Sequence, residues 1–141
     1  MLAERYKTGT IAAFLTVLIG LINVTPLCGL LFQCHCDWPW LDFYFDCNYF
    51  DAEASHKCPW CVSDLAGFGS IGLAFILAML AAVFLKTRNF AAKAITVRLT
   101  FGLAIFILIS VLSGALAAFS QHYPMGVGAS FTTIGGDNYL P

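Results

Sequence analysis

Charged side chains are scarce in this chain. Only 11% of its 141 residues are Asp, Glu, Lys or Arg, whereas 60% are hydrophobic. This composition excludes an ordinary soluble domain and is typical of a small integral membrane protein. The sequence also lacks the motifs of several common enzyme sites, because no HExxH, phosphate-binding loop, GxSxG, dinucleotide fingerprint or haem-attachment CxxCH is present.

Three long apolar stretches, 10–32, 66–85 and 95–119, dominate the sequence. Each reaches the roughly 20 residues that cross a hydrocarbon core, and none alternates as barrel strands do. The first is too long for the apolar core of a secretory signal, and no small-x-small cleavage site follows it. We therefore expect one all-α membrane domain over 1–141 with three transmembrane helices, the second of which begins at Pro59 or Ala66.

Basic residues are distributed unevenly. Six of the seven Lys and Arg residues precede the first stretch or lie between the second and third, whereas seven of the eight acids lie elsewhere. Since cytoplasmic segments of membrane proteins are enriched in Lys and Arg, this pattern predicts a cytoplasmic N-terminus. The loop 33–65 and the tail 120–141 are then expected on the outer, periplasmic side of a bacterial inner membrane.

Small side chains recur at every fourth position of two stretches, which predicts helix-packing faces, at least one of which could receive a partner chain. These positions are Ser70, Ala74, Ala78 and Ala82 in the second stretch, and Ser110, Gly114 and Ala118 in the third.

The loop 33–65 holds the distinctive chemistry of the chain. It contains five of the six cysteines, all three tryptophans, two of the three histidines and six of the eight acids. The six acids and Lys57 give it a net charge of −5, which argues against nucleic acid as a partner. Its aromatic side chains suit the membrane interface. Site residues are therefore expected in this loop, and its cysteines are Cys34, Cys36, Cys47, Cys58 and Cys61.

One hypothesis for these cysteines is structural disulfides. The outer side of a bacterial membrane is oxidising, so disulfides persist there. A bond between the two ends of the loop would contribute roughly 3–4 kcal/mol by restricting the unfolded chain. With Cys28 at the outer end of the first helix there are six cysteines, which permit fifteen pairings, and the sequence does not choose among them.

A second hypothesis is a metal site. A C-x-C at 34–36 and a C-x-x-C at 58–61 supply two pairs of thiolates, and His35 and His56 lie beside them. The spacing resembles a zinc ribbon in part, since that motif has two C-x-x-C arms. Thiolates with imidazoles also suit Cu(I). A zinc or copper ion is therefore a possible cofactor.

A third hypothesis is thiol–disulfide exchange. The CPWC motif at 58–61 places Cys58 before a helix start, where a thiolate is stabilised. This placement resembles membrane oxidoreductases of the disulfide-forming and vitamin-K-epoxide-reductase type. The resemblance implies that Cys58 and Cys61 pass electrons to a quinone, and that Cys34 with Cys36, or Cys47, shuttles them.

From the residues we expect an auxiliary subunit of a larger bacterial membrane complex, such as a redox or metal enzyme, rather than an independent catalyst. Its partners would be the lipid bilayer and other membrane subunits, and its outer loop would be stapled by disulfides or bind a metal. The alternative is a quinone-coupled thiol–disulfide oxidoreductase with Cys58 and Cys61 as the catalytic pair.

Overall fold

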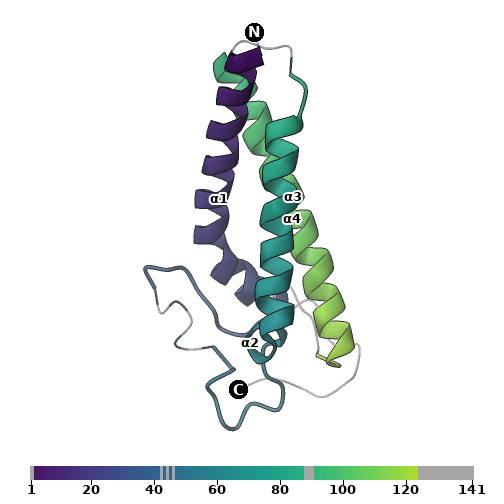
Figure 1. Cartoon of the computed structure of the whole chain (residues 1–141). Helices are drawn as coiled ribbons and strands as arrows, with labels where there is room; N and C mark the ends of the chain where they lie inside the picture. The colour runs from purple at the N-terminus through teal and green to yellow at the C-terminus, as the bar shows by residue number, and fades with distance from the viewer. Residues whose placement is uncertain (1, 42, 44, 46, 88–90, 124–141) are drawn as a thin grey trace. The chain divides into compact units, whose positions relative to one another are not determined.

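The computed structural model describes residues 2–123 except 42, 44, 46 and 88–90. The part of the expected outer tail from 124 to 141 lies outside the described residues. All regular structure in the described part is helical (Figure 1). The elements are α1 (Leu2–Phe32), α2 (Pro59–Val62), the π-helix η1 (Leu65–Gly69), α3 (Ser70–Phe84) and α4 (Ala91–Ser120).

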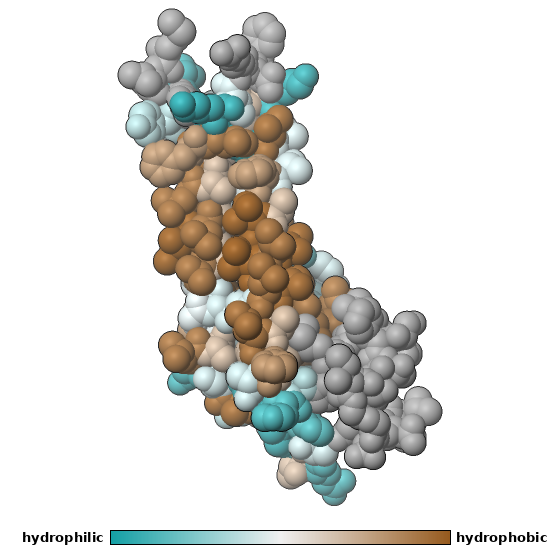
Figure 2. Space-filling model, turned by 90° about the vertical axis from the view of Figure 1, so that its right-hand side faces the viewer, coloured by the Kyte–Doolittle hydropathy of each residue, from teal (hydrophilic) through white to brown (hydrophobic). Residues whose placement is uncertain are grey.

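Among the residues that the structure describes, three helical stretches are long and apolar enough to cross a membrane, as predicted from the sequence. They cover Tyr6–Phe32, Leu65–Phe84 and Lys93–Ser120. Hydrophobic side chains cover the helices on the face drawn in Figure 2. Large apolar side chains such as Phe14 and Ile76 remain exposed. Such extensive apolar exposure is rare on soluble monomers and suits contact with lipid, so the chain is a multi-pass membrane protein.

The second span begins at Leu65 and does not continue from Pro59. The helix that Pro59 starts ends at Val62, because Ser63 is extended, with φ −122° and ψ 112°. Ser63 then starts the next helix: its Oγ accepts a hydrogen bond from the Ala66 N–H at 3.3 Å. This is the role of an N-cap side chain. Of the two starts expected from the sequence, the later one agrees with the structure to within one residue.

The chain forms two compact units, and the first contains residues 1–22 and 70–110. In this unit Ala74, Ala78 and Ala82 of α3 are completely buried. The predicted small-residue stripe of α3 is therefore a packing face. In the same unit the ring of Phe75, on α3, stacks on that of Phe106, on α4, with centroids 4.8 Å apart.

Arg98 is a basic residue of the first unit that the structure buries completely. Its Nη1 donates hydrogen bonds to the carbonyl oxygens of Val83 at 3.1 Å and Ala82 at 3.5 Å. These carbonyls belong to the last turn of α3, where helix oxygens lack intrahelical donors and carry partial negative charge. Gly9 leaves the necessary space, because a Cβ there would collide with Nη1. The guanidinium thus caps α3.

Candidate metal centre

All six cysteines come together in the second unit, which contains residues 23–69 and 111–141. The Sγ of Cys28 lies 3.3 Å from that of Cys58 and 3.5 Å from that of Cys34. Cys34 and Cys36 are 3.3 Å apart, and Cys47 and Cys61 are 3.8 Å apart. Five of the six are buried and Cys61 is partly buried. The chain thus brings all its thiols into one largely buried cluster, here called the six-thiol cluster.

The sulfurs group into four triads, and within each triad all Sγ atoms lie within 4.8 Å of one another. The triads are Cys28 with Cys58 and Cys61, Cys28 with Cys34 and Cys36, Cys34 with Cys47 and Cys58, and Cys36 with Cys47 and Cys61. Every cysteine belongs to two triads, and no two triads share a pair of sulfurs. Six points related in this way form an octahedron, and the four triads are one set of its alternate faces. Because the triads contain all twelve edges, the other four faces, such as Cys28 with Cys34 and Cys58, lie within the same 4.8 Å limit.

Cys34 and Cys36 reach the cluster because the backbone after α1 turns sharply. The residues flanking Cys34 have left-handed backbone angles, with φ 50° at Gln33 and 62° at His35. Such angles are unfavourable for residues other than glycine and mark a constrained segment. As a result, residues 33–36 alternate between exposed and buried, with both cysteines inward. Gly29 permits this course, since a Cβ there would strike the Cys36 carbonyl oxygen.

Cys58 and Cys61 lie on the single turn of α2. Cys58 is its N-cap residue, and the Cys61 N–H donates to the Cys58 carbonyl oxygen at 3.0 Å. Both sulfurs are therefore presented on one side, and both belong to the triad completed by Cys28. Gly67 in η1 allows this turn to pack closely, because a Cβ there would meet the Trp60 carbonyl oxygen.

Asn48 and Tyr123 connect the segments that carry the cysteines. The Asn48 Oδ1 accepts from the Cys58 N–H at 2.9 Å, and its Nδ2 donates to the Tyr123 hydroxyl at 2.8 Å. The Tyr123 hydroxyl donates in turn to the carbonyl oxygen of Phe32, the last residue of α1, at 2.8 Å. Asn48 Nδ2 also donates to the His56 carbonyl oxygen at 3.1 Å. One hydrogen-bond network therefore fixes the loop, α2 and the ends of α1 and α4 relative to one another.

Aromatic rings pack beside the cluster. The Phe32 ring meets Trp60 edge to face at 5.2 Å and Tyr123 at 5.8 Å. Burial raises the pKa of Tyr123 above its usual range, so its hydroxyl keeps its proton and remains a donor to Phe32. These rings pack against one another at the end of α1, close in sequence to Cys34, Cys58 and Cys61.

The packed thiols influence one another's ionisation. Hydrogen bonds from the Cys28 thiol and then from Cys34 lower the pKa of Cys58 to about 4. The pKa of Cys47 is also lowered, first by Cys34 and then by Cys36. Neighbouring thiolates repel one another, so the whole set cannot ionise together unless cations lie between them. The cluster is therefore suited to positive charge.

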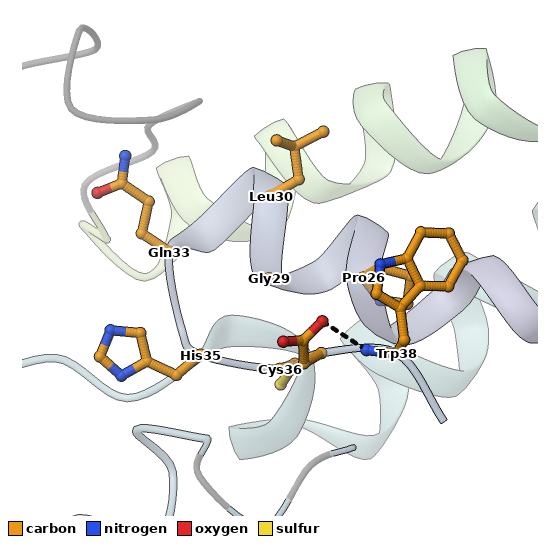
Figure 3. Close-up of a pocket in the computed structure, with 8 residues that line it drawn as sticks. Pro26, Gly29, Leu30, Gln33, His35, Cys36 and Trp38 are labelled. Carbon is orange, nitrogen blue, oxygen red and sulfur yellow. Dashed lines mark hydrogen bonds between the residues drawn. The ribbon is translucent and has the colours of Figure 1, made fainter. Parts of the chain in front are cut away.

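A pocket of about 730 Å³ opens beside the cluster. Its walls come from α1 and the segment that follows it, and are formed by Pro26, Gly29, Leu30, Gln33, His35, Cys36, Asp37 and Trp38 (Figure 3). The Asp37 Oδ1 accepts a hydrogen bond from the Trp38 N–H at 2.7 Å and fixes this part of the loop. The His35 ring is turned away from Cys36 in the same view. Small ligands could therefore approach the cluster along the Cys36 side.

The structure brings together all five cysteines expected from the loop and adds Cys28 as the sixth member. His35 and His56 are exposed and belong to none of the triads; the His56 Nδ1 lies 3.1 Å from the Ser55 Oγ. Their role as ligands stays a prediction. Sequence reasoning also missed Asn48 and Tyr123, which carry no motif. The position of Cys28 at the outer end of a membrane helix was the one available signal for its role.

All six cysteines are free thiols in this structure. Even the shortest Sγ–Sγ separation, 3.3 Å, exceeds the roughly 2.05 Å of a disulfide bond. Disulfide pairing therefore stays a prediction for an oxidised form of the same residues.

The fold and the cluster define a multi-pass membrane protein with a thiol site that could hold metal ions. Comparison of the chain with protein families, with characterised proteins and with solved structures finds no match. The function must therefore be argued from the site itself.

Proposed function

We propose that this protein binds thiophilic metal ions in its six-thiol cluster and serves as an auxiliary subunit of a larger bacterial membrane complex. The observation that carries the proposal is the convergence of all six cysteines of the chain, five of them buried, into one cluster. Thiolates are soft ligands that select ions such as Cu(I) and Zn²⁺.

The arrangement favours metal over disulfides. A disulfide gives each sulfur one partner, whereas here each sulfur belongs to two triads. One metal ion coordinates several thiolates at once, so closely packed sulfurs suit metal binding. It also supplies the positive charge that neighbouring thiolates require.

An auxiliary role is favoured over catalysis by the ligand set. A catalytic metal keeps a coordination position open for substrate, while a closed set of protein ligands holds the ion itself. Six protein thiols, mostly buried, supply such a closed set. The distribution of Lys and Arg favours the outer side of the membrane for the loop that carries the cluster, so the metal would be held for a neighbouring subunit there.

Metal retention by the full-length protein tests this proposal. The protein is purified in detergent, reduced and stripped of metal without oxygen, and then incubated with Cu(I) or Zn²⁺. After removal of loosely bound ions, the metal-to-protein ratio is measured by mass spectrometry. We expect retention by the wild type and loss of it in the Cys36→Ser/Cys58→Ser variant, which removes a ligand from every triad. A His35→Ala/His56→Ala variant is the control and should retain metal. A wild type that retains neither ion contradicts the proposal.

A second candidate function is thiol–disulfide exchange with a quinone, favoured by the position of Cys58 and Cys61 on the single turn of α2. The Cys58 and Cys61 thiols would form a disulfide, and two electrons and two protons would reduce the quinone to quinol. Against this, Cys58 is completely buried, and a reacting thiol must be accessible. Non-reduced peptide mapping after anaerobic incubation with quinone tests it: a Cys58–Cys61 bond formed together with quinol would favour the enzyme.

A further inference from the structure

We infer that the six-thiol cluster is a site for four Cu(I) ions, one on each sulfur triad, with every thiolate bridging two ions. The inference rests on the proposed metal-binding function and specifies the ion and the number bound. It is supported by which sulfurs lie close to one another, and not only by the number of cysteines.

Cu(I) is a soft ion that accepts three thiolates in a trigonal arrangement. A set of four alternate faces of the sulfur octahedron offers four such positions, and each cysteine takes part in two of them. When four trigonal ions cap alternate faces of a sulfur octahedron, each sulfur bridges two ions and no ligand is left over. The six cysteines match this ligand set in number and in connectivity.

Zinc requires a different grouping. A structural Zn²⁺ takes four ligands in a tetrahedron, so one ion would use four of the cysteines and leave two without a role. Two Zn²⁺ ions sharing two bridging thiolates would gather the sulfurs into two sets of four. The sets found here are triads. The ligand sets that Zn²⁺ requires therefore match the observed sulfur triads less well than those of Cu(I).

Iron–sulfur clusters also fit poorly. In them the cysteine sulfurs surround a core of iron and inorganic sulfide, which holds the sulfurs apart. Here the Sγ atoms of Cys28 and Cys58, and those of Cys34 and Cys36, are 3.3 Å apart. Such close sulfurs leave room for single ions on the faces of the octahedron but not for a core of sulfide.

Charge and protons balance without a redox step. Six thiols lose six protons when four Cu(I) ions form twelve Cu–S bonds, three for each ion, and the product carries a net charge of −2. Copper remains Cu(I) throughout and the sulfurs remain thiolates. Formation of the cluster therefore needs only Cu(I) and a base such as the buffer to accept the protons, and it should release acid.

The surroundings suit a reduced copper cluster. Cys34 and Cys58 are completely buried and Cys47 is nearly so, which excludes water and oxidants from most of the sulfurs. The pocket beside Cys36 offers a path by which ions could arrive. Access beside Cys36 and at the partly buried Cys61, with the other four cysteines buried, favours loading followed by stable retention.

The number of ions is tested on the full-length protein in detergent, loaded without oxygen with Cu(I) as its acetonitrile complex. We expect native mass spectrometry to show four copper ions per chain. X-ray absorption should show sulfur-only coordination by three ligands with a short copper–copper distance. Retention of only one or two ions, or tighter retention of Zn²⁺ than of Cu(I), overturns this inference and leaves the metal-binding proposal standing. Retention of no metal overturns both.

Pairs of substitutions give a sharper test, because the octahedron distinguishes opposite from adjacent sulfurs. Cys36 and Cys58 share no triad, so Cys36→Ser/Cys58→Ser removes a ligand from all four triads. Cys34 and Cys36 share one, so Cys34→Ser/Cys36→Ser leaves the triad of Cys28, Cys58 and Cys61 intact. Both variants keep four cysteines. We expect the adjacent pair to retain one copper ion and the opposite pair none.

Equal copper content in the two double variants overturns the inference. Circular dichroism and size-exclusion chromatography in detergent show whether each variant folds. If the opposite pair fails to fold, Cys34→Ser/Cys61→Ser is a second opposite pair that leaves Cys28 in the membrane helix unchanged. For the wild type, the number of bound copper ions and the copper–copper distance test the four-copper site without any variant.

Discussion

Single residues without a chemical function of their own determine whether the cluster can form. Gly29 is the clearest case, because the Cys36 backbone passes so close to α1 that no Cβ fits. Tyr123 is another, since its hydroxyl joins Asn48 to the last carbonyl of α1. Both lie outside the cysteine motifs, yet both position the sulfurs.

We predict that Gly29→Ala lowers metal content and stability, because the added methyl group displaces the Cys36 carbonyl and with it one vertex of the octahedron. Gly72→Ala is the matched control, since a Cβ there meets nothing within 4 Å. Bound metal and thermal unfolding in detergent measure both effects. Equal metal content in the two variants would show that the close approach at Gly29 is unimportant.

We predict that Tyr123→Phe weakens metal binding about tenfold or more, as is typical when a group that orients metal ligands is removed. The substitution keeps the ring contacts with Phe32 and removes the hydrogen bonds to Phe32 and Asn48. Tyr49→Phe, on an exposed ring of the same loop, should leave affinity unchanged. Competition with a chelator of known affinity measures this, and equal affinities in the two variants would exclude a positioning role for Tyr123.

The helices differ in how their faces are used. In α3 the small residues Ala74, Ala78 and Ala82 are buried, while larger apolar side chains such as Ile76 face outward. Without water as a driving force, helices in lipid associate by close packing, which small residues permit. The buried stripe of α3 is thus a contact made within the chain.

We predict that Ala78→Leu destabilises the protein by about 1–3 kcal/mol, because overpacking a tight contact forces the helices apart. Ala78 has no exposed surface, whereas Ile76 is 53% exposed. Ile76→Phe, which also adds volume, is therefore expected to have little effect. Denaturation in detergent compares the two, and a larger loss for Ile76→Phe would contradict the proposed packing face.

The orientation in the membrane decides which compartment supplies the metal. The distribution of Lys and Arg favours a cytoplasmic hairpin between α3 and α4 and an outer loop carrying the cluster. In that orientation the cluster meets an oxidising compartment, where metal occupancy would protect its thiols from pairing.

We predict that a membrane-impermeant maleimide labels Ser55→Cys but not Thr87→Cys in intact cells with a permeable outer membrane. Ser55 is an exposed residue of the loop, and Thr87 follows α3 in the basic hairpin. Labelling of the wild type measures the background from its own cysteines, and labelling after lysis shows that both new thiols react. The reverse pattern would place the cluster in the cytoplasm.

The spans could be predicted from the sequence because crossing a membrane depends on local properties, namely length and hydrophobicity. The start of the second span was ambiguous, since only the extended backbone of Ser63 separates α2 from η1. Likewise, the cysteine motifs showed which residues could bind metal. They did not show that Cys28, in the first helix, completes the same set.

The sequence by itself determined a three-span helical membrane protein with a cysteine-rich loop. Only the tertiary structure decided that all six sulfurs meet, and in which triads. The physical reason is how far apart along the chain the interacting residues lie. Hydrophobic runs act through neighbouring residues, whereas Cys28 and Cys58 lie 30 residues apart and meet because Gly29, Asn48 and Tyr123 fix separate segments against one another.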